Sequence, residues 1–232
     1  MTTERVEVSP SDSVRRKIEL FLPRLVEAGD RLIEHPRVRD LYPEYLFTSH
    51  SVIRASVPLM EAALERTHAT ADADPVAALL GPYLEEHIDE ERDHDEWLLD
   101  DLEVLGRRRD ATLARVPSPT IAGLVGAQYY WIFHYHPVVL LGYISLLEGY
   151  PPSTELIERL MRATGYPRDS FRTMLAHAEL DPGHRDELNE LLDSLPLTPE
   201  QASALGVNAM WTVVTFTRAI DELLEGFPAA VA

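Results

Sequence analysis

Cysteine is absent from this 232-residue chain. Its absence excludes disulfides, thiolate metal sites and a cysteine nucleophile. Any metal ion must therefore be bound by histidine, aspartate or glutamate side chains. The nine histidines become the residues to follow.

Long apolar runs and an excess of positive charge are also missing. No stretch approaches the roughly 18 uninterrupted apolar residues of a membrane span, and residues 1–10 contain no apolar signal-peptide core. The 21 basic and 39 acidic residues give a net charge of −18. Nucleic acids and anionic membranes need clustered lysine and arginine, so both are disfavoured as partners. We expect a cytoplasmic protein.

Strand alternation and hairpin turns are lacking as well, and apolar residues recur with helical spacing instead. The sequence predicts an all-α fold: a disordered tail over residues 1–11, then a single domain of about seven helices over residues 12–232. Ser11 or Ser13 is the expected N-cap of the first helix, and Pro43 is expected to open the second. The helices are predicted near residues 12–34, 44–66, 75–106, 120–148, 154–164, 168–192 and 198–225.

Three potential metal ligands lie in one short stretch of the sixth predicted helix. His177, Asp181 and His184 occupy positions i, i+4 and i+7, which share one helix face. Imidazole and carboxylate are ligands that iron, manganese and zinc accept. The alternative is an ordinary solvated helix face.

Two further segments offer ligands of the same types. The third predicted helix carries His87, Glu90, Glu91 and His94, and the fourth ends at Glu148 after an apolar run. Each residue alone has an ordinary structural explanation. Their coincidence in one helical chain favours a metal site built from facing helices.

The pattern resembles the haem-oxygenase-like superfamily, and within it the non-haem dimetal oxidases. The resemblance covers about residues 75–190. The matching residues are His94 followed by Trp97 to Leu102 with Leu105-Gly106, Leu141-Gly142-Tyr143, Leu147-Glu148-Gly149, and His177, Asp181 and His184.

This resemblance implies a haem-oxygenase-like helical bundle that binds Fe(II), two ions per chain, and uses O2 as co-substrate. The expected substrate is a small amine, amino acid or fatty-acid-like metabolite. Carried over by position, the metal ligands are His94, Glu148, His177, Asp181 and His184.

The sixth ligand position departs from the family pattern. The family has glutamate seven residues before the first histidine, and this chain has His87. Either His87 is itself a ligand, or Glu91 or Glu90 supplies the carboxylate. If none of them binds, the centre holds a single metal.

The substrate pocket is expected beside the metal ligands, bordered by the fourth predicted helix. Tyr130 and His134 lie on that helix, and Arg54 and Arg218 lie in largely apolar helices where a cation needs a partner. We therefore take these four residues as candidate pocket residues.

Two alternative functions remain open. A haem-binding protein is disfavoured, because the first predicted helix has only His35, next to Pro36, and no glycine pair follows the Tyr150-Pro151-Pro152 turn. A non-catalytic metal-binding helical protein is the other alternative. The expected partner is a small-molecule substrate, and an external electron donor and a homodimer are compatible with the sequence.

Overall fold

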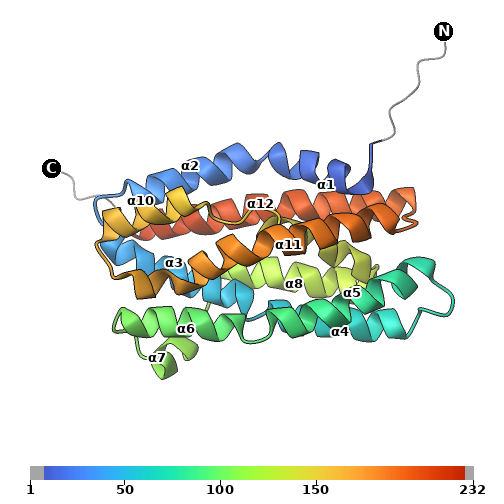
Figure 1. Cartoon of the computed structure of the whole chain (residues 1–232), viewed down its shortest axis with the longest axis horizontal. Coiled ribbons are helices and arrows are strands. Elements are labelled where there is room, and N and C mark those ends of the chain that lie inside the picture. The colour runs from blue at the N-terminus through green and yellow to red at the C-terminus, as the bar shows by residue number, and fades with distance from the viewer. Residues whose placement is uncertain (1–7, 228–232) are drawn as a thin grey trace, which may run out of the picture.

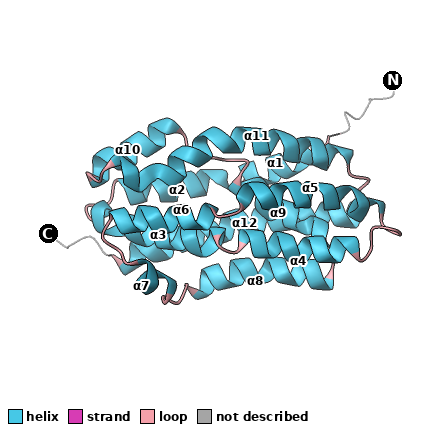
Figure 2. Cartoon of the chain, turned by 60° about the horizontal axis from the view of Figure 1, so that its bottom comes forward, coloured by secondary structure: helices cyan, strands magenta, loops and turns pink. Residues whose placement is uncertain are grey.

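Helices account for all the regular structure in the computed structural model, which describes residues 8–227 (Figures 1 and 2). No strand occurs in that range, so the all-α prediction is confirmed. The α-helices are α1 (Pro10–Glu19), α2 (Leu22–Ile33), α3 (Val38–Ile53), α4 (Ser56–His68), α5 (Pro75–Glu91), α6 (His94–Val104), α7 (Arg109–Leu113), α8 (Pro119–His134), α9 (Leu141–Leu147), α10 (Thr154–Thr164), α11 (Arg172–Ser194) and α12 (Pro199–Gly226). Two short 3₁₀ segments, η1 (Pro137–Leu140) and η2 (Arg168–Phe171), precede α9 and α11.

The predicted number of about seven helices is too low, because four of the predicted helices are broken and α7 was not expected. Three of the breaks come just before Pro23, Pro58 or Pro137. Proline lacks the N–H that would bond the carbonyl four residues back, so a helix ends readily at this point. The fourth break, between α5 and α6, contains Asp93 with a left-handed φ of 69°.

Pro43 was expected to open the second helix, but it lies inside α3 instead. Helix α3 begins at Val38 and continues through Pro43. Proline at this position leaves the carbonyl of Arg39 without its helical partner. The hydroxyl of Tyr166 donates a hydrogen bond to that carbonyl over 3.1 Å, which compensates for the lost bond.

The first helix begins earlier than predicted. Ser9, rather than Ser11 or Ser13, is the N-cap of α1. Both the backbone N–H and the hydroxyl of Ser11 donate to the carboxylate of Asp193, each over 2.9 Å. The expected disordered tail therefore does not extend to residue 11, and residues 1–7 lie outside the described residues.

The helices pack along one long axis (Figure 1). Helix α11 contacts α5, α6 and α9. The buried apolar residues form two clusters, one centred on α4, α5, α8, α9 and α12 and the other on α2, α3, α6 and α10. Among residues 8–227, no helix is long and apolar enough to cross a membrane.

Candidate metal centre

Helix α11 supplies three of the predicted ligands from one face. Asp181 and His184 are buried, and His177 is half-buried. Nδ1 of His177 donates to the carbonyl of Thr173 over 2.9 Å. This hydrogen bond fixes the tautomer, so the lone pair on Nε2 is free for a metal ion.

The break between α5 and α6 brings Glu91 and His94 together. Glu91 is the last residue of α5 and His94 the first of α6. Glu91 Oε2 lies 3.2 Å from His94 Nδ1, and both side chains are buried. The carboxylate of Glu91 would be destabilised by burial, but its contact with His94 holds its pKa below the usual value.

Glu148, at the C-terminal end of α9, interacts with His87. Nε2 of His87 lies 2.8 Å from Glu148 Oε1, and Nδ1 lies 3.2 Å from Oε2 of the more exposed Glu90. Burial alone would lower the pKa of His87, but the hydrogen bond to Glu148 and the charges of Glu148 and Glu91 raise it to about 9. Burial raises the pKa of Glu148.

The donors form two groups, and within each group the ligand atoms lie within 4.8 Å of one another. The first group is His87, Glu148 and His184, and the second is Glu91, His94 and His177. Glu91 links the groups, because its second oxygen, Oε1, lies 3.8 Å from Nδ1 of His184. His87 and His94 are seven residues apart, a spacing that would place both on one face of an unbroken helix. The break at Asp93 separates them into different groups.

Asp181 belongs to neither group but lines the same cavity as Glu91, Glu148 and His177. Its burial, together with the negative charges of Glu148 and Glu91, raises its pKa to about 8. Three carboxylates within one buried region repel one another unless cations or protons neutralise them.

The unsatisfied atoms in this region fit a metal centre. Four of the donor residues each have a buried nitrogen or oxygen without a hydrogen-bond partner: Glu91 Oε1, Glu148 Oε2, Asp181 Oδ1 and His184 Nδ1. Buried polar atoms are normally paired, so a cluster of unpaired ligand atoms fits a centre that binds a cation. Imidazole and carboxylate donors are the set that iron(II) accepts.

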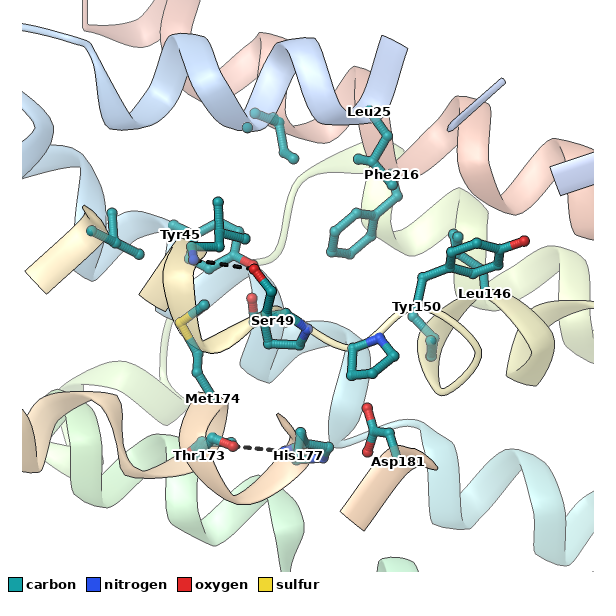
Figure 3. Close-up of a pocket in the computed structure, with 18 of the residues that line it drawn as sticks. Leu25, Tyr45, Ser49, Leu146, Tyr150, Thr173, Met174, His177, Asp181 and Phe216 are labelled. Atoms are coloured by element: carbon teal, nitrogen blue, oxygen red, sulfur yellow. Dashed lines mark hydrogen bonds between the residues drawn. The ribbon is translucent and has the colours of Figure 1, made fainter. Parts of the chain in front are cut away.

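A cavity of about 660 Å³ adjoins the donors. His177 and Asp181 lie on one side of it, with Leu25 and Phe216 among the residues on the other (Figure 3). Its remaining lining is largely aliphatic and comes mainly from α2, α3, α9, α10 and α12 and from the segment between α9 and α10. Hydroxyl groups come from Tyr45, Ser49, Ser56, Tyr150, Ser153 and Thr173.

None of the four predicted pocket residues lines this cavity. Arg54 is exposed at the break after α3, and Tyr130 and His134 lie on the outer face of α8. Arg218 is exposed on α12 and pairs with Glu222. The structure does not bring these four residues to the cavity, because each lies on an outer face of its helix that the apolar pattern did not reveal.

Apart from the metal donors, the residues that line the cavity carry no sequence motif. Leu25, Tyr45, Met174 and Phe216 have the same spacing as ordinary core residues. Only the aliphatic face of residues 22–33 could have indicated a cavity wall. Of the predicted fourth helix, only Leu146, Leu147 and Glu148 at its C-terminal end border the cavity.

Comparison with known proteins agrees with this geometry. A family described as iron-containing redox enzymes matches residues 49–217. No match to the chain was found among the curated proteins.

Solved structures with the same fold include three relatives of low sequence identity. A domain of unknown function from Shewanella denitrificans, with a heme oxygenase-like fold, is 18% identical, with a TM-score of 0.77 and coverage of 92% of this chain and 90% of that one. A CADD-like protein of unknown function from Nostoc punctiforme is 15% identical (TM-score 0.67; 96% and 98% covered). A TenA homolog from Pseudomonas syringae is 13% identical (TM-score 0.65; 89% and 92% covered). The haem-oxygenase-like fold prediction is confirmed.

Proposed function

The chain belongs to the family of iron-containing redox enzymes, and from this premise we propose that it is a two-iron, O2-dependent oxidase or oxygenase of a small metabolite. The observation that supports this proposal best is the pair of adjacent donor groups linked by Glu91. Each group combines histidine with carboxylate, which suits iron(II) and leaves positions for O2 and substrate.

The two groups suggest an assignment of ligands. Glu91, His94 and His177 would hold one iron. Glu148 and His184 would hold the other, joined by Asp181 from the cavity wall and by His87. In this assignment Glu91 replaces the missing family glutamate, and His87 is an additional nitrogen donor. Glu90 remains outside, as the hydrogen-bond partner of His87.

The iron ions, when bound, would supply the O2 chemistry, and the protein would supply position and environment. Thr173 orients His177 through its carbonyl. The aliphatic walls of the cavity would exclude water from the reacting groups. With cations bound, Glu91, Glu148 and Asp181 would be ionised and carry three negative charges, one fewer than the four positive charges of two divalent cations. The loaded centre would therefore favour an anionic substrate group.

The cavity favours a fatty-acid-like substrate over an amine or an amino acid. Apart from histidine, its only basic lining residue is Arg159. Arg159 already pairs with Asp30 over 2.9 Å, so it is a poor partner for a substrate carboxylate. An apolar chain would fill the aliphatic region, and its carboxylate would face the metal donors.

Anaerobic Fe(II) titration of the metal-free protein, followed by metal analysis and O2-uptake measurement, tests the proposal. We expect two irons per wild-type chain and rapid O2 uptake. His177→Ala removes one donor from the Glu91 group and should leave about one iron. His134→Ala, an exposed histidine on α8, is the matched control and should retain two.

Each other outcome has a definite meaning. Equal iron content in the wild type and His177→Ala would contradict the ligand assignment. One iron per wild-type chain would contradict the two-iron centre. Two irons without O2 uptake would favour a non-catalytic metal-binding protein.

A further inference from the structure

Glu90 contacts two of the metal donors from the solvent side. Its Oε2 atom lies 3.2 Å from Nδ1 of His87 and 3.8 Å from Nε2 of His184. Both histidines are buried, whereas the Glu90 side chain is 36% exposed. A single carboxylate oxygen therefore lies between solvent and two nitrogens of the same donor group.

The cavity approaches the centre from other donors. Four of the donor residues line the cavity, but His87 and His184 do not, and Glu90 does not line it either. The donors are therefore accessible by two separate routes, one through the cavity and one past Glu90.

The two routes suit different molecules. The cavity has largely aliphatic walls, and a charge without a partner is costly to bury among such side chains. An apolar substrate can enter there at little cost, whereas a divalent cation cannot. Glu90 instead offers an exposed carboxylate, which is a ligand that iron(II) accepts.

A second exposed carboxylate lies near the same route. The ring of Tyr83 stacks on that of His87, with the centroids 5.1 Å apart. The negative charges of Glu90, on α5, and Glu187, on α11, both raise the pKa of Tyr83, so both carboxylates lie near this ring. Both are exposed. The negative potential between α5 and α11 would attract cations to the point where Glu90 meets the donors.

We propose that Glu90 is the entry ligand through which iron(II) reaches the group of His87, Glu148 and His184. This inference rests on the proposed function, because it concerns the same centre. The cation would bind first to the exposed carboxylate and would then pass to the two histidines. Iron exchange and substrate binding would therefore use different openings of the protein.

An entry ligand has a kinetic signature of its own. When a route becomes harder to cross, it becomes harder in both directions, so the rates of uptake and release fall together and the affinity does not change. A residue that only supports His87 in the loaded centre would behave differently. Its loss would lower the affinity and leave the uptake rate unchanged.

Anaerobic rapid mixing of the metal-free protein with Fe(II) tests the proposal. A chromogenic chelator added at timed intervals measures the ion not yet bound, and excess chelator added to the loaded protein measures release. Glu90→Gln keeps the size of the side chain and removes its charge. Uptake and release should both become about tenfold slower, with two irons still bound at the end. Asp89→Asn removes the same charge from a neighbouring side chain that is 81% exposed and pairs with Arg92. As the matched control, it should keep the wild-type rates.

A second variant separates the two routes. Gly29 lines the cavity, and its Cβ would have open space, so Gly29→Leu narrows the cavity without touching Glu90. Its uptake rate should equal that of the wild type. Slow uptake in Gly29→Leu, with normal uptake in Glu90→Gln, would assign iron entry to the cavity and overturn the proposal.

The remaining outcomes distinguish this proposal from the proposed function. Two irons bound with unchanged rates in Glu90→Gln would overturn the entry route alone. A lower affinity with an unchanged uptake rate would also overturn it and would make Glu90 a support for His87. A wild type that binds no iron would contradict the proposed function, and the entry route with it.

Discussion

At the scale of single residues, the donor side chains depend on contacts that the sequence pattern does not contain. His177 is oriented by a backbone carbonyl, and His87 lies between two carboxylates. Glu91 and His94 come together only because the chain turns at Asp93. The sequence identified the residue types, whereas their grouping required the structure.

Gly29 offers a test of the cavity at this scale. It lines the cavity from α2, and no atom lies within 4 Å of the position its Cβ would take. Gly29→Leu should fill part of the cavity and weaken dodecanoate binding to the anaerobic ferrous protein by about tenfold, or about 1.4 kcal/mol. Octanoate, which occupies less of the cavity, should be affected less. Isothermal titration calorimetry measures both affinities.

The matched control is Gly226→Leu, at the exposed end of α12, where a Cβ also has open space. Its fatty-acid affinities should equal those of the wild type. Replacing a helical glycine should not lower the melting temperature in either variant. Unchanged affinities in Gly29→Leu would show that apolar ligands do not occupy this cavity.

At the scale of helices, the contact between α9 and α12 positions Glu148. A Cβ at Gly142 would lie 2.5 Å from the carbonyl oxygen of Leu205 and 2.9 Å from the backbone nitrogen of Ala209. Both atoms are backbone atoms of α12, so they cannot move aside without shifting the helix. Glycine therefore permits the close approach that holds α9 in place.

We predict that Gly142→Ala lowers the free energy of unfolding by about 1–3 kcal/mol, the usual cost of overpacking. Because α9 ends at Glu148, iron binding at the His87, Glu148 and His184 group should weaken as well. Urea denaturation and Fe(II) titration measure the two effects. Gly126→Ala, on the open face of α8, should be neutral or stabilising. Equal stability of the wild type and Gly142→Ala would contradict this account of the α9–α12 contact.

Helix existence was predictable in this chain, and helix boundaries were less so. Thr198 and Gln201 form a capping box at the start of α12, and Asp74 is the N-cap of α5, as their residue types and spacing favour. Pro43 is a poor guide to the start of α3, because the backbone hydrogen bond that it removes is replaced by one from Tyr166, which is distant in sequence. Such compensation depends on tertiary contacts and has no local signal.

At the scale of the whole molecule, the metal donors link stability to pH. In the metal-free chain, Asp181 has a pKa of about 8, whereas an unfolded aspartate titrates near 3.9. The folded state therefore binds more protons than the unfolded state between about pH 4 and pH 8, and its stability falls as the pH rises through this window. The raised pKa of His87, about 9, extends the loss of stability to higher pH.

We predict that the melting temperature of the metal-free protein falls between pH 6 and pH 9 in a chelating buffer. Asp181→Asn, which remains neutral, should show a smaller fall and a higher melting temperature than the wild type at pH 9. Asp89→Asn, on an exposed side chain, should follow the wild type. Identical pH profiles for Asp181→Asn and the wild type would contradict the raised pKa of Asp181. Differential scanning calorimetry gives the profiles.

The overall fold was readily predictable because its signals are long and redundant. Helical periodicity indicated an all-α bundle, and the family resemblance carried by three ligand-bearing segments implied the haem-oxygenase-like fold. The pocket was not predictable, because cavity walls and packed cores use the same aliphatic residues at the same spacing. Only the three-dimensional arrangement shows which apolar residues border empty space, as Gly29 does.

The turn at Arg92 and Asp93 has a consequence for motion. Glu91 and His94 belong to one donor group but to two different helices. A cation bound by both residues would restrain the joint between α5 and α6. The angle between the two helices and the binding of the cation are therefore thermodynamically linked. By reciprocity, anything that stiffens the joint strengthens cation binding, and the bound cation stiffens the joint to the same extent.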